Sequence, residues 1–165
     1  MSYEIHPETP PEGVLLERLF GPGVRQGQEG LRRRAVELGL HFDPPERLSN
    51  TRLAVEAAEF ARDAGKHAEF HREVLAAYFA RSEDVGDVEV LVRAAEEVGL
   101  DGVGLRAALA GGAYAAKRQA AEAEARELGI SGVPTFIFSA GPKVVGAQPL
   151  DHFRRLLTGL VAAER

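Results

Sequence analysis

The chain has 165 residues, of which 45% are hydrophobic and 27% are charged, a composition typical of one globular domain. Its net charge of −5 argues against nucleic acid as the main partner, because phosphate binding needs a basic surface. There is no cysteine, which excludes a disulfide framework, cysteine-ligated zinc and a cysteine nucleophile within this chain.

Nothing in the sequence indicates a membrane protein. No stretch approaches the roughly 20 apolar residues that a membrane span needs. Residues 1–11 lack the basic and apolar regions of a signal peptide. We therefore expect no membrane partner and a cytoplasmic location. The single run of basic residues, Arg32 to Arg34, falls inside a helical pattern and is interpreted as a solvated helix face.

The first third of the chain mixes short elements with prolines. Residues 3–5 alternate as a short strand would, and the prolines that follow end regular structure. A short helical turn is predicted over 14–20. A longer helix is predicted over 24–38, ending before Gly39.

The middle of the chain is predicted to be helical. Apolar residues recur at the helical spacing in successive segments. An alanine- and glutamate-rich segment follows them, and its Glu122, Glu124 and Glu127 are interpreted as a solvated helix face. Ser49 or Asn50 is a candidate N-cap for the first of these helices, and Asp87 and Asp101 are candidate N-caps for later ones. The predicted helices cover residues 53–64, 70–79, 88–98, 101–110 and 113–128.

The pattern changes near the C-terminus. Pro134 to Phe138 is a compact run of aromatic and β-branched residues, typical of a strand. Residues 139–142 indicate a turn, and Lys143 to Val145 a returning strand. Pro149 then begins a final helix, since proline suits the first turn.

Several motifs together resemble a known family. The segment Gly132-Val133-Pro134-Thr135-Phe136, followed by residues 144–149 and a terminal helix, resembles the second half of a thioredoxin fold. More narrowly, it is similar to the FrnE-like branch of the DsbA family, which is related to 2-hydroxychromene-2-carboxylate isomerases. The resemblance runs from about Tyr3 to the C-terminus. It includes His6-Pro7-Glu8, Asn50-Thr51-Arg52, the helix from Phe70-His71 through residues 77–79, and Gly86-Asp87 before residues 88–91.

This resemblance implies an α/β fold, namely a truncated thioredoxin-like fold with a large all-helical insertion, a C-terminal β-hairpin and a terminal helix. We expect a single domain over residues 1–165. Within it, residues 1–12 would be a remnant of the second thioredoxin strand and residues 13–128 a mainly helical insertion. Residues 129–165 would supply the cis-proline loop, the hairpin and the terminal helix of the thioredoxin core.

The resemblance also implies a substrate-binding position. In the family, the proline matched by Pro134 is cis and lies against the active-site dithiol. The residue matched by Val133 offers backbone groups to an extended thiol substrate. We therefore expect a thiol-containing peptide or small molecule at Val133 and Pro134, no metal, and no cofactor unless glutathione is bound. The family's strand, Cys-X-X-Cys and helix (serine in the isomerases) have no counterpart here, so we expect no catalytic residue and no dithiol exchange by this chain itself.

Three functional interpretations stay open at this point. The chain is a shortened thiol–disulfide oxidoreductase, a degenerate paralogue that serves as a binding or scaffold module, or a glutathione-linked isomerase relative without its nucleophile. A hypothesis from another class is a metal-dependent hydrolase, because His67 and His71 are four residues apart on a predicted helix. No third ligand is apparent, and Ala68 stands where a zincin has glutamate.

The resemblance finally predicts a two-fold homodimer. In a thioredoxin-like sheet the first strand lies between the second strand and the hairpin, and this sequence has no match to it. One edge of the strand Thr135 to Phe138 would then be unpaired. Two arrangements would pair this edge: residues 2–5 in the vacant position of the same sheet, or a strand from another chain. We favour the second, because a four-residue segment covers little of the edge.

Overall fold

The computed structural model describes residues 4–43 and 45–163 and divides into two compact units, Met1–Glu122 and Ala123–Arg165. The sequence predicted one domain with internal limits at residues 12 and 128. Those limits stay a prediction, and the boundary between the compact units falls inside α7. In chain order the elements are β1 (Val14–Leu15), α1 (Leu16–Phe20), α2 (Val24–Glu37), β2 (Arg47–Leu48), α3 (Arg52–Asp63), α4 (His67–Arg81), α5 (Val88–Glu97), α6 (Gly102–Ala110), α7 (Ala115–Glu127), β3 (Thr135–Phe136), β4 (Val144–Val145) and α8 (Leu150–Ala163).

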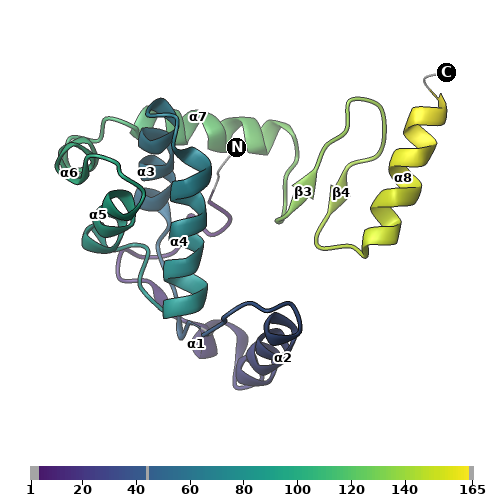
Figure 1. Ribbon diagram of the computed structural model, residues 1–165, viewed down its shortest axis with the longest axis horizontal. Helices are drawn as coiled ribbons and strands as arrows, with labels where there is room; N and C mark the ends of the chain where they lie inside the picture. Colours follow the sequence, from purple (N-terminus) through teal and green to yellow (C-terminus); the bar gives the residue numbers. More distant parts are fainter. Residues whose placement is uncertain (1–3, 44, 164–165) are drawn as a thin grey trace. The chain divides into compact units, whose positions relative to one another are not determined.

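The core of the first unit lies between α3, α4, α5 and α6, which pack on one another (Figure 1). The largest fully buried side chains are Phe70, Leu91 and Leu105, one from each of the last three of these helices. Helix α3 contributes mainly alanines, Ala54, Ala57, Ala58 and Ala61. Small side chains of this kind let neighbouring helices approach closely.

The helices agree closely with the sequence prediction. Asp87 caps α5 by accepting a hydrogen bond from the Glu89 amide at 2.8 Å, and Asp101 caps α6 by accepting one from the Gly104 amide at 3.0 Å. Both predicted N-caps are therefore confirmed. The predicted N-cap of α3 at Ser49 or Asn50 is wrong, because the N-cap residue is Thr51 and its side chain makes no capping hydrogen bond. The Asn50 side chain, one residue earlier, accepts a hydrogen bond from the amide of Arg52 at 3.1 Å.

The N-terminal region differs from the prediction. Residues 4–12 contain turns and no strand, and residues 1–3 lie outside the described residues. The predicted helical turn over 14–20 begins instead with β1, which pairs antiparallel with β2 in the register Val14↔Leu48. Gly13 precedes β1 with φ of +70°, and a Cβ there would lie 2.6 Å from the Leu48 carbonyl oxygen. Two-residue strands leave no alternating pattern, so the sequence did not reveal this pair.

The second unit contains a β-hairpin and a helix. Strands β3 and β4 are antiparallel, with Thr135 opposite Val145 and Phe136 opposite Val144. The predicted hairpin is confirmed, but its strands are shorter than predicted: β3 ends at Phe136 and β4 begins at Val144. The Phe136 ring meets Phe153 of α8 edge-on, with 4.7 Å between the ring centroids. That contact joins the hairpin to its helix.

The core predicts how stability responds to truncation of a side chain. Phe70 is completely buried, so Phe70→Ala should lower the free energy of unfolding by about 3–5 kcal/mol through lost burial and a residual cavity. Phe20 is 61% exposed, so Phe20→Ala should change it by less than about 0.5 kcal/mol. Urea denaturation followed by circular dichroism measures both values. Equal losses in the two variants would contradict this description of the core.

Candidate functional site

The loop that joins α7 to β3 contains the two residues predicted to bind substrate. It turns at Gly129, which has φ of +59°, and reaches β3 through a cis peptide bond between Val133 and Pro134. The Thr135 hydroxyl donates to the carbonyl oxygen of Gly132 at 2.6 Å, which closes the loop on itself. Val133 is 57% exposed. Val133 and Pro134 are thus presented together at the surface of the second unit.

Two contacts fix this loop within the second unit. The Pro134 carbonyl accepts a hydrogen bond from the Gly146 amide at 2.7 Å, which extends the pairing of β3 with β4 by one position. The Lys143 ammonium donates to the carbonyls of Leu128 and Gly129 at 2.8 and 2.7 Å. It therefore satisfies carbonyls at the C-terminal end of α7, where helices leave them unpaired. Among the described residues, the backbone N–H and C=O of Val133 have no hydrogen-bond partner.

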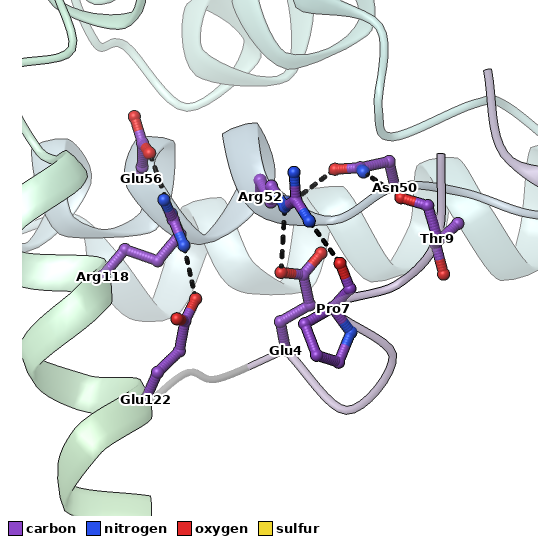
Figure 2. A network of polar contacts seen from close by, with 8 residues as sticks. All are labelled: Glu4, Pro7, Thr9, Asn50, Arg52, Glu56, Arg118 and Glu122. Atoms are coloured by element: carbon purple, nitrogen blue, oxygen red, sulfur yellow. Dashed lines mark hydrogen bonds and ion pairs between the residues drawn. The ribbon is translucent and has the colours of Figure 1, made fainter. Parts of the chain in front are cut away.

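A second group of polar residues lies in the first unit, around Arg52 (Figure 2). The Arg52 guanidinium donates to the carboxylate of Glu4 at 3.4 Å and to the carbonyl of Pro7. Next to it, the Asn50 amide donates to the Thr9 carbonyl at 2.6 Å. Two side chains at the start of α3 thereby hold a loop more than forty residues earlier in the chain.

Three motifs that carried the family resemblance meet at this point. His6-Pro7-Glu8 and Asn50-Thr51-Arg52 are joined by the contact from Arg52 to Pro7. Gly86 lies against Asn50, since a Cβ at Gly86 would be 2.9 Å from the Asn50 carbonyl oxygen. The space between these segments therefore excludes any side chain at position 86. The sequence indicated each motif separately but not that they are in contact.

Arg118 of α7 forms the other half of the network in Figure 2. Its guanidinium donates to Glu56 of α3 at 3.0 Å and to Glu122 at 2.5 Å. All three side chains are largely buried. Burial alone lowers the pKa of Arg118, but the hydrogen bonds to Glu56 and Glu122 outweigh it, and its pKa lies above the ordinary value. Arg118 is therefore a permanent charge balanced by two carboxyl groups, and it joins the part of α7 in this unit to α3.

Glu4 is the carboxyl group in this network whose burial is least compensated by hydrogen bonds and opposite charge. Its side chain is 1% exposed, and its Oε1 atom is buried without a hydrogen-bond partner. Burial raises the pKa of Glu4 above 4.5, and the opposing effect of Arg52 is smaller. A buried carboxyl of this kind can hold a proton at a pH where exposed carboxyls have lost theirs.

Sequence reasoning missed most of this network. Glu4, Glu56 and Arg118 carry no motif, and the sequence interpreted Glu122 as part of a solvated helix face. That interpretation is wrong for Glu122, which is mostly buried against Arg118. The motifs of the family resemblance marked the N-terminal loop and the start of α3. Nothing in the sequence marked the part of α7 that carries Arg118 and Glu122.

The metal hypothesis receives no support from the described residues. His67 and His71 stack with ring centroids 5.8 Å apart, but His67 Nε2 lies 2.9 Å from a guanidinium nitrogen of Arg62. Burial, Arg62 and His71 together lower the pKa of His67. No group of three or more histidine, cysteine, aspartate or glutamate side chains in residues 4–43 and 45–163 could hold a metal ion. In the same part of the chain, no helix is both long and apolar enough to cross a membrane.

The raised pKa of Glu4 predicts how the stability of a Glu4 variant depends on pH. Because its folded-state pKa is raised, its contribution to stability is complete below the ordinary pKa of 4.5 and is lost as the pH rises through the folded value. Glu4→Gln should therefore become increasingly more stable than wild type as the pH rises above 4.5. Urea denaturation across a pH series measures the difference.

Glu8→Gln is the matched control for this experiment. A hydrogen bond from the backbone amide and one from His6 lower the pKa of Glu8, so the glutamine at this exposed position should give no gain in stability with rising pH. If Glu4→Gln were less stable than wild type at neutral pH, Glu4 would be an ionised partner of Arg52 and the prediction would be wrong.

Comparisons with known proteins agree with this architecture. Residues 12–158 match the family described as DSBA-like thioredoxin domain. An uncharacterized protein of Bacillus subtilis (strain 168), YwbO, is 32% identical over 163 residues, which are 96% of this chain and 79% of the relative. The crystal structure of a probable DsbA oxidoreductase from Streptomyces coelicolor, SCO1869, matches 99% of this chain and 74% of its own, with 31% identity and a TM-score of 0.85. The chain therefore belongs to the family of DSBA-like thioredoxin domains.

Proposed function

We propose that this chain binds an extended thiol-containing peptide, or a small thiol such as glutathione, at Val133 and Pro134. One observation carries the proposal. The backbone N–H and C=O of Val133 have no partner among the described residues, and the residue is exposed. An extended peptide satisfies such groups by adding alongside the chain as a further strand does.

The surroundings of Val133 suit a ligand that is recognised through hydrogen bonds to its backbone. Residues 130–136 carry no charged side chain, so charge does not select the ligand here. The loop is held by the Thr135 hydroxyl and by the bond between Pro134 and Gly146, which reduces the entropy that binding would cost. The thiol in the proposed ligand rests on the family and on the likeness to a probable DsbA oxidoreductase.

The proposed role is binding, not dithiol exchange. A thiolate is the nucleophile of that reaction, and the chain has no cysteine to provide one. Of the interpretations left open by the sequence, we favour membership of the thiol–disulfide oxidoreductase group, with this chain supplying a binding surface and no redox cysteine. Assignment to the FrnE-like branch and a cytoplasmic location remain predictions from the sequence.

The missing thiolate predicts an inactive protein in a redox assay. The purified chain should not accelerate the reduction of insulin by dithiothreitol above the uncatalysed rate, because attack on a disulfide needs a thiolate. Turbidity from the precipitating insulin B chain measures the reaction, and thioredoxin serves as the positive control. Turnover that scales with the concentration of this chain would contradict the prediction.

Binding through the backbone of Val133 predicts a specific pattern of variants. Val133→Pro removes the N–H group, so it should weaken the binding of reduced glutathione by roughly three- to tenfold, the equivalent of one lost hydrogen bond. Val133→Ala keeps the N–H group and should bind with affinity close to that of wild type. Calorimetry at millimolar glutathione measures all three affinities.

A second measurement locates the ligand. In amide NMR spectra of the wild-type chain, glutathione should shift the signals of Val133 and Thr135 and leave that of Val103, on α6, in place. The proposal would be refuted by wild-type protein that binds no glutathione, or by Val133→Ala losing as much affinity as Val133→Pro.

A further inference from the structure

A cleft of about 430 Å³ lies in the first unit, between the segment that leads through β2 and the turn that follows α4. Its polar lining residues are Asp43, Glu46, Arg47 and Ser49 from the first segment and Ser82 and Asp84 from the second. Three carboxylates and one guanidinium give this lining a net negative charge. Carboxylates accept hydrogen bonds and donate none, so a ligand of this cleft has to be a donor.

The carboxylates of the cleft have acceptor atoms that the chain itself does not use. Asp84 Oδ1 accepts a hydrogen bond from the Gly86 amide at 2.9 Å, and no described residue donates to its Oδ2. The Glu46 carboxylate has no partner among the described residues. The guanidinium of Arg47 does not neutralise them by contact, because it donates to two backbone carbonyls of the N-terminal loop.

A buried serine in the wall of the cleft has an unused hydroxyl. Ser49 is 4% exposed, yet its hydroxyl has no hydrogen-bond partner among the described residues. The hydroxyl is not sealed inside the protein, since Glu4 Oε1 is the one described side-chain polar atom cut off from both solvent and a partner. It therefore reaches the open space that Ser49 lines. Buried hydroxyls are usually hydrogen-bonded, so this one marks a position for a donor from a ligand.

The distribution of the carboxylates decides which kind of cation suits the cleft. Among residues 4–43 and 45–163, no three histidine, cysteine or acidic side chains are placed to hold one metal ion. The acidic groups instead come from two separate segments, with Glu46 before β2 and Asp84 after α4. A short aliphatic diamine carries two ammonium groups on a flexible chain, and each ammonium has three N–H donors. Asp43 contributes least, because it already meets Arg32 at 3.4 Å.

We propose that this cleft binds a short aliphatic diamine. One ammonium group donates to Asp84 Oδ2 and to the Ser49 hydroxyl, and the other meets the carboxylate of Glu46. Asp84 is half-buried and Glu46 is exposed, so salt screens the interaction with Asp84 less. The proposal does not depend on ligand binding at Val133, which belongs to the second unit.

Isothermal titration calorimetry of the full chain with putrescine, a four-carbon diamine, at low ionic strength tests the proposal. Wild type should show saturable binding at roughly millimolar putrescine. Asp84→Asn keeps the oxygen that accepts from Gly86 and should weaken binding about tenfold, because it removes a charge-assisted hydrogen bond. Glu46→Gln should weaken it about two- to fivefold, as expected for an exposed ion pair. Ser49→Ala should weaken it about threefold. Circular dichroism verifies that each variant is folded.

Glu97→Gln is the matched control, because it removes the same charge at an exposed position at the end of α5 and should bind putrescine as wild type does. Butanediol with the same four-carbon chain is the ligand control, and it should not bind because it has no charge. In amide NMR spectra, putrescine should shift the signals of Ser49 and Asp84 and leave that of Val103 in place.

Three results would overturn the proposal. The first is folded wild type that shows no saturable binding of putrescine. The second is a Glu97→Gln variant that loses as much affinity as Asp84→Asn, because affinity would then follow the net charge of the chain and not the cleft. The third is butanediol binding as tightly as putrescine, because the cleft would then not recognise charge.

Discussion

The hydrogen bonds from Asn50 and Arg52 to the N-terminal loop are the interaction on which the first unit depends. Asn50 is buried and uses both ends of its side chain, donating to Thr9 and accepting from the amide of Arg52. Loss of either partner would leave a buried polar atom without a hydrogen bond and lower the free energy of unfolding by about 1–3 kcal/mol. The loop, the start of α3 and the backbone beside Gly86, which carry three of the motifs behind the family resemblance, are therefore held against one another.

The charged side chains next to Asn50 and Arg52 are buried, and most of them have partners of opposite charge. Arg118 is held between Glu56 and Glu122, so a buried cation has a partner on each side. Glu4 is less completely compensated, because only Oε2 has a partner and Oε1 has none. Helix α3 thus contributes alanines to the core from one side and the charged residues Arg52 and Glu56 to this network from another.

In the second unit, backbone carbonyls accept the hydrogen bonds that hold the loop before β3. Lys143 and Gly146 satisfy carbonyls on either side of the loop, and Phe136 fixes the hairpin on α8. Among the described residues, the backbone N–H and C=O of Val133 have no hydrogen-bond partner.

The sequence by itself determined the elements whose signals are local. The helical spacing located α3 to α7, Asp87 and Asp101 marked the starts of α5 and α6, and the change to β-branched and aromatic residues located the hairpin. Only the tertiary structure decided that Glu4 is buried, that Glu56 meets Arg118, and that β1 pairs with β2. These contacts join residues 32 to 62 positions apart, and their signal is not periodic. Whether a charged side chain is solvated or buried depends on which distant segment covers it, and that is a property of the packed chain and not of its local sequence.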